Sequence, residues 1–464
     1  MAEERLTDEA VRDPIKEWFI PIFGEDDHQQ PEPEAKSKHP IPKAPAKFRE
    51  YKQEKKYFDP RVVSLGPYHH GKDLLKPMEK YKITAAKQFV DDLKDETGGR
   101  GTIYKKFMEL TGVWKGFYDA EMVPKRISDD AEMVTKRISD HDFARMMFLD
   151  GCFVLYFIEN ELPFDGRATM LEISNNLIPL IIRDMFLIEN QLPFEVLDAL
   201  INLRWGSISE GKEKILKFIE WKVFIPMGFF GIDHFIMAFL GLPIDQPLDE
   251  RPFHGSLHLL DILRNILLDF PPSNGAENDS SEQRNFGSVT ELKEIGIRFE
   301  KRYMQPLMDI SFEEHLLFPR LLLPTMFIND TTISLLLNLT AFEMCSDIHS
   351  GCGVTSYIRF MDSLINHEAD VKELRSKGIL HHSLGSDDEV ARLFNTWPGD
   401  VRNDIQLYSG ISTQIFEHRN RKVKISIAKW LKKYFGSPWT AISFVAAVLL
   451  LVFTAIQTYF AAFS

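Results

Sequence analysis

The strongest constraint in this 464-residue chain is its C-terminus, where the last 31 residues, 434–464, contain no charged side chain. The apolar run 441–463 has 23 residues, about 34 Å of helix at about 1.5 Å per residue. This length fits a tilted span across a hydrocarbon core about 30 Å thick. Pro438 and Trp439 precede it, as expected for a helix start and an interfacial aromatic. The run predicts a transmembrane helix over 441–463, and a buried C-terminal core helix is the alternative.

The segment before this run, 419–440, is basic and contains no acidic residue. Its cations are Arg419, Arg421, Lys422, Lys424, Lys429, Lys432 and Lys433. By the positive-inside rule, they place the large N-terminal part in the cytoplasm. The charged N-terminus lacks the apolar stretch of a secretory signal peptide. We therefore expect a tail-anchored, single-pass protein of the plasma membrane or an endomembrane, with the lipid bilayer as one partner.

The charge of the remaining chain excludes one class of partner. The formal charge is −13 for the whole chain, and −20 without the seven cations named above. Binding to nucleic acid requires a basic surface that neutralises phosphates. No nucleic-acid partner is therefore predicted.

Cysteine usage indicates a reducing compartment, because Cys152, Cys345 and Cys352 are too few for a disulfide framework. Cys345 and Cys352 could pair across a short loop if the body were extracellular. Cys152 lies in an apolar run, which is typical of an inert core cysteine.

Three N-glycosylation sequons begin at Asn278, Asn329 and Asn338. Asn338 sits in an apolar run and is expected to be buried. Because sequons arise often by chance, they do not decide the topology.

Composition divides the chain into four parts. Residues 1–47 are predicted to form a short amphipathic helix and a flexible linker rich in Pro and charge. A helical body over 48–418 follows, with a disordered insertion near 271–288. The basic segment 419–440 and the apolar run 441–463 complete the chain.

The body is predicted to be mainly α with at most a minor β component. Apolar residues recur at three- and four-residue spacing in Asp73–Leu93, Asp142–Asn160, Ile178–Leu203, Leu257–Asp269, Thr290–Phe299, Thr331–Cys345, Ser356–Asn366 and Asp387–Asn395. Thr290 and Ser386 are candidate helix caps. The region 299–323 has alternating and β-branched pieces and is expected to include short strands.

An eleven-residue segment, 119–129, recurs as 130–140 with ten identical positions. Eleven residues make about three helical turns, so a duplication could extend a helix and keep its apolar stripe aligned. Pro124 in the first copy favours a kink or a break. We interpret the repeat as a tandem duplication in a tolerant surface region.

A second repeat pairs Phe157–Phe164 (FIENELPF) with Leu187–Phe194 (LIENQLPF). In each copy, an apolar helix is predicted to end at Glu-Asn, since a proline follows three residues later. We expect two stacked helix–turn elements. The functional alternative is that Glu159 and Glu189 form a paired-carboxylate site.

Two histidine pairs, His69-His70 and His381-His382, raise the question of a metal site. Adjacent residues point apart in a strand and lie about 100° apart in a helix, so one pair makes a poor chelate. The sequence contains neither His-Glu-x-x-His nor Cys-x-x-Cys. No metal site is predicted, and these histidines are expected to be solvated or to pack in loops.

Four acidic residues lie in apolar helical contexts: Asp150, Asp184, Glu189 and Glu343. We expect them to be buried and paired with Arg145, Arg183 or backbone groups, which serves structure rather than catalysis. The sequence has no Gly-x-Ser-x-Gly elbow and no Gly-rich phosphate loop ending in Lys-Ser/Thr. No catalytic or cofactor-binding residue is predicted, and no cofactor is expected.

A series of ordered segments resembles one known family. They are Asp59–Gly71 (DPRVVSLGPYHHG), 78–82 (MEKYK), Phe148–Phe153 (FLDGCF), Arg183–Leu197 (RDMFLIENQLPFEVL), His258–Arg264 (HLLDILR), Val289–Phe299 (VTELKEIGIRF), Asn338–Cys345 (NLTAFEMC), Thr355–Asp370, Lys377–Ile379, Asp387–Asn395 and Ser437–Thr458. From about residue 40 to 461, the chain resembles the plant-specific family built on domain of unknown function 247. The linker 25–47 and the doubled segment 119–140 depart from the usual pattern.

This resemblance implies one domain with a closing membrane segment and no established enzymatic activity. Some grass members are implicated in self-incompatibility as pollen recognition determinants, which implies a protein-interaction role. The family has no accepted catalytic residues, so none is transferred. The preferred hypothesis is a non-enzymatic, membrane-anchored module that binds an unidentified protein. The alternative is a membrane-tethered hydrolase or transferase that uses His69, His70 and buried acids.

Overall fold

The structure, a computed structural model, describes residues 41–50, 55–93, 100–118, 138–162, 171–205, 207–224, 251–268, 287–302, 310–315, 318–345, 352–398, 408–421 and 438–463. These residues are mainly helical with a few short strands, as predicted. The predicted N-terminal helix, most of the linker, nearly all of the duplicated segment and most of the predicted insertion lie outside them.

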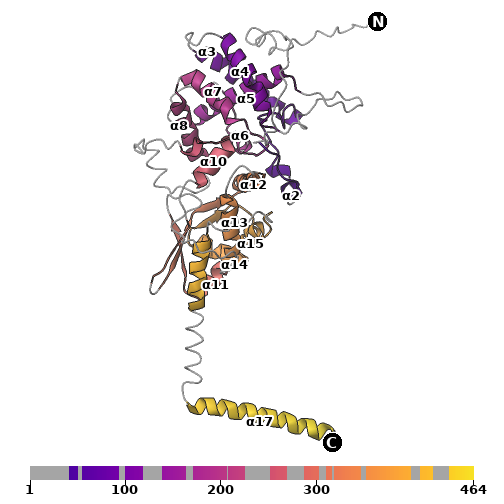
Figure 1. Cartoon of the computed structure of the whole chain (residues 1–464), viewed down its shortest axis with the longest axis vertical. Helices are drawn as coiled ribbons and strands as arrows, with labels where there is room; N and C mark the ends of the chain where they lie inside the picture. The colour runs from indigo at the N-terminus through magenta and orange to yellow at the C-terminus, as the bar shows by residue number, and fades with distance from the viewer. Residues whose placement is uncertain are drawn as a thin grey trace, which may run out of the picture.

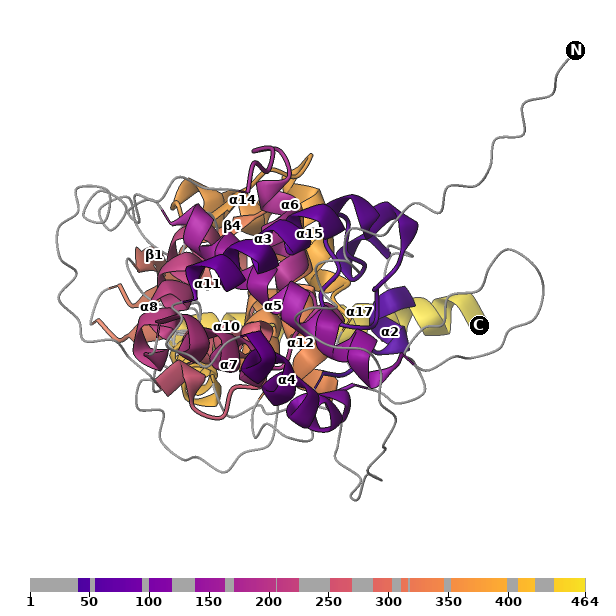
Figure 2. The same cartoon turned by 90° about the horizontal axis from the view of Figure 1, so that it is seen from above.

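Helices form the upper part of the molecule in Figure 1, with α5 at their centre (Figures 1 and 2). They are α3 (Glu79–Asp92), α4 (Arg100–Lys115), α5 (Asp140–Glu161), α6 (Ile178–Met185), α7 (Phe194–Trp205), α8 (Ile208–Ile219) and α10 (Leu259–Leu268). Helices α3, α4, α7 and α8 pack against α5. Helix α5 is apolar on nearly every side, so it is buried only where other helices surround it. Ser139 caps α5 by accepting the Asp142 N–H at 3.0 Å.

Short helical turns connect these helices and cover their ends. They are α2 (Ala46–Glu50), η2 (Lys55–Tyr57), η3 (Asp73–Met78), η6 (Glu220–Phe224) and η7 (Arg251–Phe253). The predicted helix Asp73–Leu93 is therefore observed as η3 followed by α3. Pro77 lies at this junction, and a proline cannot donate the backbone hydrogen bond of an uninterrupted helix.

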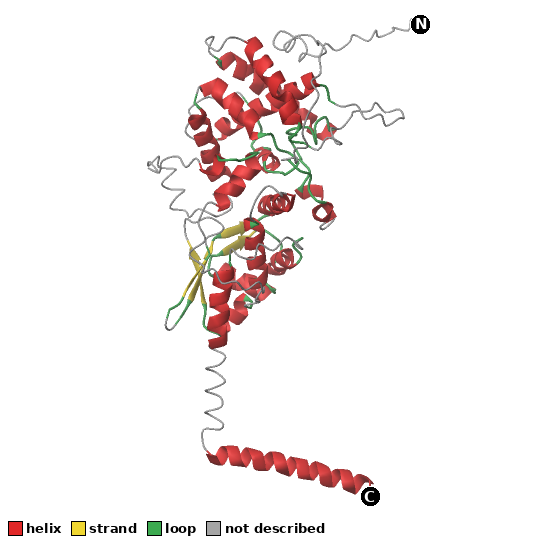
Figure 3. Ribbon diagram, in the orientation of Figure 1, coloured by secondary structure: helices red, strands yellow, loops and turns green. Residues whose placement is uncertain are grey.

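The lower part combines strands with helices (Figure 3). Strand β3 (Arg320–Pro324) is central, parallel to β1 (Arg298–Arg302) and antiparallel to β2 (Ser311–Glu313). Phe299 and Phe312 both lie opposite the buried Leu321. Strands β4 (Met326–Ile328) and β5 (Leu380–His382) form a separate parallel pair. The helices are α11 (Val289–Glu294), α13 (Gly353–Leu364), α14 (Glu368–Ser376), α15 (Asp387–Asn395) and the helical residues 409–421.

Helix α12 (Asp330–Cys345) joins the two parts, since it packs against α6 and η2 on one side and α13 and β4 on the other. Asn338 in its middle is fully buried, as predicted. Its amide donates to the Tyr57 carbonyl at 2.8 Å and accepts the Ile188 N–H at 2.9 Å. A side chain in this position is inaccessible to glycosylation.

Two predicted helices are interrupted. The segment Ile178–Leu203 forms α6 and α7 with a turn between them, and Pro193 stands immediately before the first residue of α7. Helix α11 ends at Glu294, and Gly296 then takes a φ of 91° before β1 begins. The cap of α11 is Ser288 rather than Thr290.

The predicted transmembrane helix over 441–463 is overturned. Within the part of the chain that the structure describes, no helix has the length and apolar character that crossing a membrane requires. The apolar run lies in helix α17 (Pro438–Phe463). The predicted tail anchor and single-pass membrane location depend on this helix, and they are therefore also wrong.

The alternative, a buried C-terminal core helix, is also wrong. Leu450, Leu451 and Phe453 of α17 are 67%, 70% and 61% exposed. Two cations of the basic segment instead contact the body: Arg419 lies 3.7 Å from Glu291, and Arg421 lies 3.8 Å from Glu314. The other five cations lie outside the described residues.

Candidate functional site

The end of α6 and the turn after it, 183–191, carry five polar side chains, all of them buried: Arg183, Asp184, Glu189, Asn190 and Gln191. Asp184 binds the segment 61–63. Its Oδ2 atom accepts the backbone N–H groups of Arg61, Val62 and Val63 at 2.9, 2.7 and 3.1 Å. Arg183 donates to the other oxygen at 2.7 Å. Burial raises the pKa of Asp184, and Arg183 and the three N–H groups oppose that rise.

Asn190 and Gln191 continue this pattern. Asn190 accepts the Leu65 N–H at 2.7 Å and donates to the Val63 carbonyl at 3.1 Å. Gln191 donates to the Leu187 carbonyl at 2.8 Å and accepts the Leu260 N–H, at the start of α10, at 3.0 Å. These side chains therefore hold backbone groups of segments far away in the sequence.

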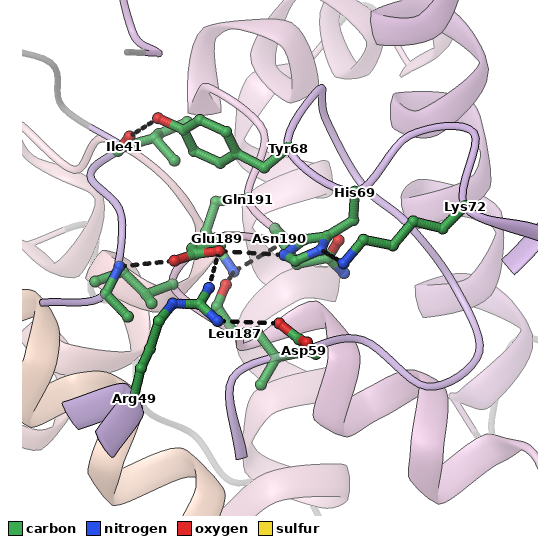
Figure 4. A network of polar contacts seen from close by, with 12 residues as sticks. Ile41, Arg49, Asp59, Tyr68, His69, Lys72, Leu187, Glu189, Asn190 and Gln191 are labelled. Atoms are coloured by element: carbon green, nitrogen blue, oxygen red, sulfur yellow. Dashed lines mark hydrogen bonds and ion pairs between the residues drawn. The ribbon is translucent and has the colours of Figure 1, made fainter. Parts of the chain in front are cut away.

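Glu189 fastens the N-terminal segment 41–50 to the body (Figure 4). Its Oε1 atom accepts the Ala44 N–H at 2.9 Å, and Arg49 donates to Oε2. His69 Nε2 lies 3.4 Å from the same oxygen. Burial disfavours the charged carboxylate, but the hydrogen bonds from His69, Arg49 and the Ala44 N–H lower the pKa of Glu189 to about 2.

We call Arg49, Asp59, His69, Lys72 and Glu189 the latch cluster. Arg49 also donates to Asp59 at 3.3 Å, so its guanidinium bridges two carboxylates. Lys72 Nζ lies 2.6 Å from His69 Nδ1. Because the ammonium group only donates, the ring proton of a neutral His69 sits on Nε2, toward Glu189.

The latch cluster also contains metal-ligand atoms, since donors of Asp59, His69 and Glu189 all lie within 4.8 Å of one another. Zinc accepts these ligand types. However, Arg49 already bridges the two carboxylates, and a second cation, Lys72, contacts the imidazole. A metal ion would have to displace both cations, so the arrangement favours a protein charge network.

A second buried charge cluster lies beside α5. The fully buried Lys82 ammonium contacts Asp150 and Glu79 at 2.7 Å each. Asp150 also accepts the Gly66 N–H at 2.9 Å. Burial raises the pKa of Asp150, against the effect of Lys82. Gly66 has a φ of 69°, and a Cβ there would lie 2.9 Å from the Tyr118 hydroxyl, so this turn requires glycine.

The two acids of the repeat have separate partners rather than forming a paired-carboxylate site. Glu159 binds the side chains of Arg204 and Lys214 at 2.7 and 3.0 Å, whereas Glu189 belongs to the latch cluster. The two copies also differ in backbone, since α5 runs on to Glu161 while α6 ends at Met185.

Of the four histidines in the two pairs, one is buried, one is partly buried and two are exposed. His70 and His381 are exposed, while His382 contacts Asp387 at 2.7 Å. His69 is 3% exposed and lies in a loop next to the buried Tyr68, so of the two expected environments it has the packed one and not the solvated one. No spacing in the sequence indicated its contact with Glu189, which is 120 residues away.

The remaining predicted residues are structural. Cys152 is buried, and burial raises the pKa of its thiol well above the usual value. Glu343 accepts from Arg264 at 3.0 Å and from the N–H groups of Val354 and Thr355 at 3.0 and 2.9 Å. The expected pairing of buried acids with arginine or backbone groups is confirmed for Asp184 and Glu343. Asn278 lies outside the described residues.

Comparisons with known proteins identify the family of the chain. The chain is 26% identical over 437 residues to UPF0481 protein At3g47200 of Arabidopsis thaliana, covering 87% of this chain and 82% of that protein. It is 28% identical over 187 residues to Putative UPF0481 protein At3g02645 of the same plant, covering 39% and 34%. No solved structure matches. The profile of DUF247, described as "Plant protein of unknown function", matches residues 41–453. Both buried charge clusters lie within that range, and the chain belongs to the DUF247 family of plant proteins.

Proposed function

We propose that this chain is a protein-interaction module without enzymatic activity, and that α17 is its docking element. The observation that carries the proposal is the exposure of large apolar side chains on one helix: Leu450, Leu451, Phe453 and Tyr459 are 61–70% exposed. Large exposed apolar patches on proteins mark interaction sites.

The fitting partner is a protein with an apolar groove that accepts a helix. Residues 434–464 carry no charge, so recognition rests on burial of apolar side chains rather than on ion pairs. Helix α17 stands apart from the rest of the described chain in Figure 1, which leaves its sides accessible.

The buried polar residues support a structural role for the body. Asp184, Glu189 and Asn190 each hold backbone groups of distant segments. The sequence-based alternative, a hydrolase or transferase that uses His69 and His70, gains no support from their geometry. The contacts of His69 are Lys72 and Glu189, neither of which is a nucleophile of the hydroxyl or thiol type.

The test is affinity capture from plant extract with the full chain, followed by cross-linking mass spectrometry. The test variant is Leu450→Ser/Leu451→Ser/Phe453→Ser. The matched control is Leu74→Ser/Val113→Ser, which removes exposed apolar side chains from the body. We expect cross-links between α17 and one protein, loss of capture by more than tenfold in the α17 variant, and full capture by the control.

The partner must then bind the full chain after both are purified. Cross-links outside α17, or equal capture by the α17 variant, would overturn the proposal. Flotation of the full chain with phosphatidylcholine vesicles, lost in the same variant, would overturn it as well. Substrate turnover by the purified chain would overturn the non-enzymatic assignment.

A further inference from the structure

The N-terminal segment 41–50 (IPKAPAKFRE) contains the pattern Pro-x-x-Pro, at Pro42 and Pro45. Proline fixes the backbone φ near −65°, so this pattern favours the extended polyproline II conformation, which has three residues per turn. The residues from one proline to the other belong to no helix or strand, and Ile41 and Ala44, three residues apart, are both buried. The segment therefore turns one face toward the body, as a proline-rich peptide does in a complex.

Two side chains of the body hold the backbone of this segment (Figure 4). The Tyr68 hydroxyl donates to the Ile41 carbonyl at 2.8 Å. Glu189 accepts the Ala44 N–H at 2.9 Å. The Ile41 N–H donates to the Phe117 carbonyl at 2.9 Å. These hydrogen bonds use main-chain groups of the segment, so any peptide with the same extended backbone offers the same donors and acceptor.

Two tyrosines line the contact with the Pro-x-x-Pro part. The rings of Tyr68 and Tyr118 meet edge to face, with their centroids 5.5 Å apart. Ile41 pairs with Tyr118 in an isolated parallel β-bridge, and the Lys43 ammonium lies 5.4 Å from the centre of the Tyr68 ring. Grooves lined by aromatic side chains are the usual receptors for Pro-x-x-Pro peptides.

The two residues after this part, Phe48 and Arg49, add side-chain contacts. Phe48 is fully buried and meets Phe58 edge to face, with ring centroids 6.2 Å apart. Arg49 donates to both Glu189 and Asp59, so its guanidinium lies between two carboxylates. An aromatic contact and an acidic pair therefore select an aromatic residue followed by arginine.

We propose that the surface under 41–50 is a peptide-binding site, which this segment fills within the chain and which a segment of a partner protein fills in its place. We call it the strap site and define it by Phe58, Asp59, Tyr68, Tyr118 and Glu189. The partner segment is a proline-rich peptide with the pattern Pro-x-x-Pro-x-x-Phe-Arg. The strap site is separate from α17, so this inference goes beyond the proposed function and does not depend on it.

Charge favours such a peptide. The segment 41–50 has a formal charge of +2, from Lys43, Lys47, Arg49 and Glu50, whereas the whole chain has −13. Opposite charges on a peptide and its receptor accelerate their encounter and select against acidic competitors.

The attached segment competes with any free peptide. Linkage within one chain gives 41–50 an effective concentration on the order of millimolar at the strap site. A free peptide of the same sequence therefore binds the natural chain weakly, and its binding increases once the contacts of the attached segment are removed.

The test measures binding of the peptide IPKAPAKFRE to the full chain by fluorescence anisotropy, with the label on an amide at its N-terminus. The variant Phe48→Ser/Arg49→Glu weakens the attached segment and leaves the strap site unchanged. We expect this variant to bind the peptide about tenfold more tightly than the natural chain does, or better. The control peptide IPKAPAKSEE carries the same two changes and should bind about tenfold more weakly.

A matched pair of tyrosine variants tests the strap site itself. Tyr68→Phe, added to the variant with the weakened segment, removes the hydroxyl that binds the Ile41 carbonyl and should weaken peptide binding about three- to tenfold. Tyr81→Phe removes a hydroxyl that binds the Glu172 carbonyl and should leave binding unchanged. Hydrogen exchange checks that only 41–50 is released. Arg49→Ala is the milder variant, used in the same way if the double variant does not fold.

Absence of peptide binding to a variant whose hydrogen exchange shows 41–50 released and the rest protected would overturn the proposal. Equal binding of the two peptides would reduce the contact to nonspecific attraction and overturn it too. A dimer of the natural chain, seen by light scattering and lost in Phe48→Ser/Arg49→Glu, would assign the strap site to a second copy instead of a partner protein.

Discussion

The two copies of the repeat, FIENELPF at 157–164 and LIENQLPF at 187–194, share most of their letters and have different structural roles. In the first copy, the acids bind side chains: Glu159 contacts Arg204 and Lys214, and Glu161 contacts Lys222. In the second copy, the polar residues bind mainly backbone groups, and four of these groups lie more than 60 residues away. A charged side chain that loses its partner can turn to another one, whereas a buried backbone N–H or carbonyl is fixed in place and cannot.

The largest expected difference is between Asn190→Ala and Asn160→Ala. Asn190 is fully buried, and its removal leaves the Leu65 N–H and the carbonyls of Val63 and Asp184 without this partner. We expect a loss of about 4 kcal/mol in unfolding free energy, against less than about 1 kcal/mol for Asn160→Ala. Urea denaturation of both variants measures this. Equal losses would remove the proposed distinction between the copies.

The next effect compares Glu189→Gln with Glu159→Gln. The first variant leaves Arg49 and His69 beside a neutral amide in a site where Glu189 is 3% exposed. The second leaves Arg204 near Asp92, at 3.3 Å, and stacked over Tyr156. We expect losses of about 3 and about 1 kcal/mol respectively. Hydrogen exchange over 41–50 should increase in Glu189→Gln alone, and a similar increase in Glu159→Gln would contradict the latch.

The contribution of Glu189 should depend on pH. Its pKa is about 2 in the folded chain and roughly 4.3 when unfolded. Because the folded value is the lower one, the stabilisation is present above pH 4.3 and is lost as the pH falls toward 2. The difference in unfolding free energy between the natural chain and Glu189→Gln should be about 3 kcal/mol at pH 7. It should shrink as the pH falls from 4.3 toward 2. Asp150 and Asp184 titrate in both proteins and cancel in the difference, so a gap that persists at pH 2 would argue against the assignment.

The smallest effect is expected for Lys222→Ala, which removes the partner of Glu161 in the first copy. The lysine is about one-third exposed and lies 2.7 Å from the carboxylate. Ion pairs of this kind contribute roughly 0–1 kcal/mol, and salt screens them. We expect a loss below about 1 kcal/mol that shrinks in 0.5 M salt. A loss above 2 kcal/mol would mean that the first copy contributes as much to the unfolding free energy as the second.

Local signals in the sequence predicted much of the fold. The apolar period placed a helix over Asp142–Asn160, and α5 spans Asp140–Glu161. Ser386 caps α15 as predicted, because its hydroxyl accepts the Glu389 N–H. The same apolar period predicted one helix over Ile178–Leu203, and this is wrong because a turn interrupts the apolar segment. It also carried the predicted helix from Thr290 on to Phe299, past the start of β1 at Arg298, although short strands were expected over 299–323.

Local sequence signals did not predict the latch cluster. Glu189 meets Arg49 across 140 residues and Ala44 across 145. The spacing of residues along the sequence does not indicate a contact between the turn after α6 and the segment 41–50. At the uncharged C-terminus the sequence predicted too much, since its composition indicated a membrane span that the described residues do not support.

The sequence by itself determined that the chain folds mainly into helices, where some of them begin and end, and the family to which it belongs. These properties follow from periodicity, caps and ordered motifs, which act over a few residues at a time. The tertiary structure decided which of two nearly identical motifs holds the backbone of distant segments and which pairs with nearby side chains. That choice depends on burial, because a polar group needs a fixed partner only where water cannot reach it.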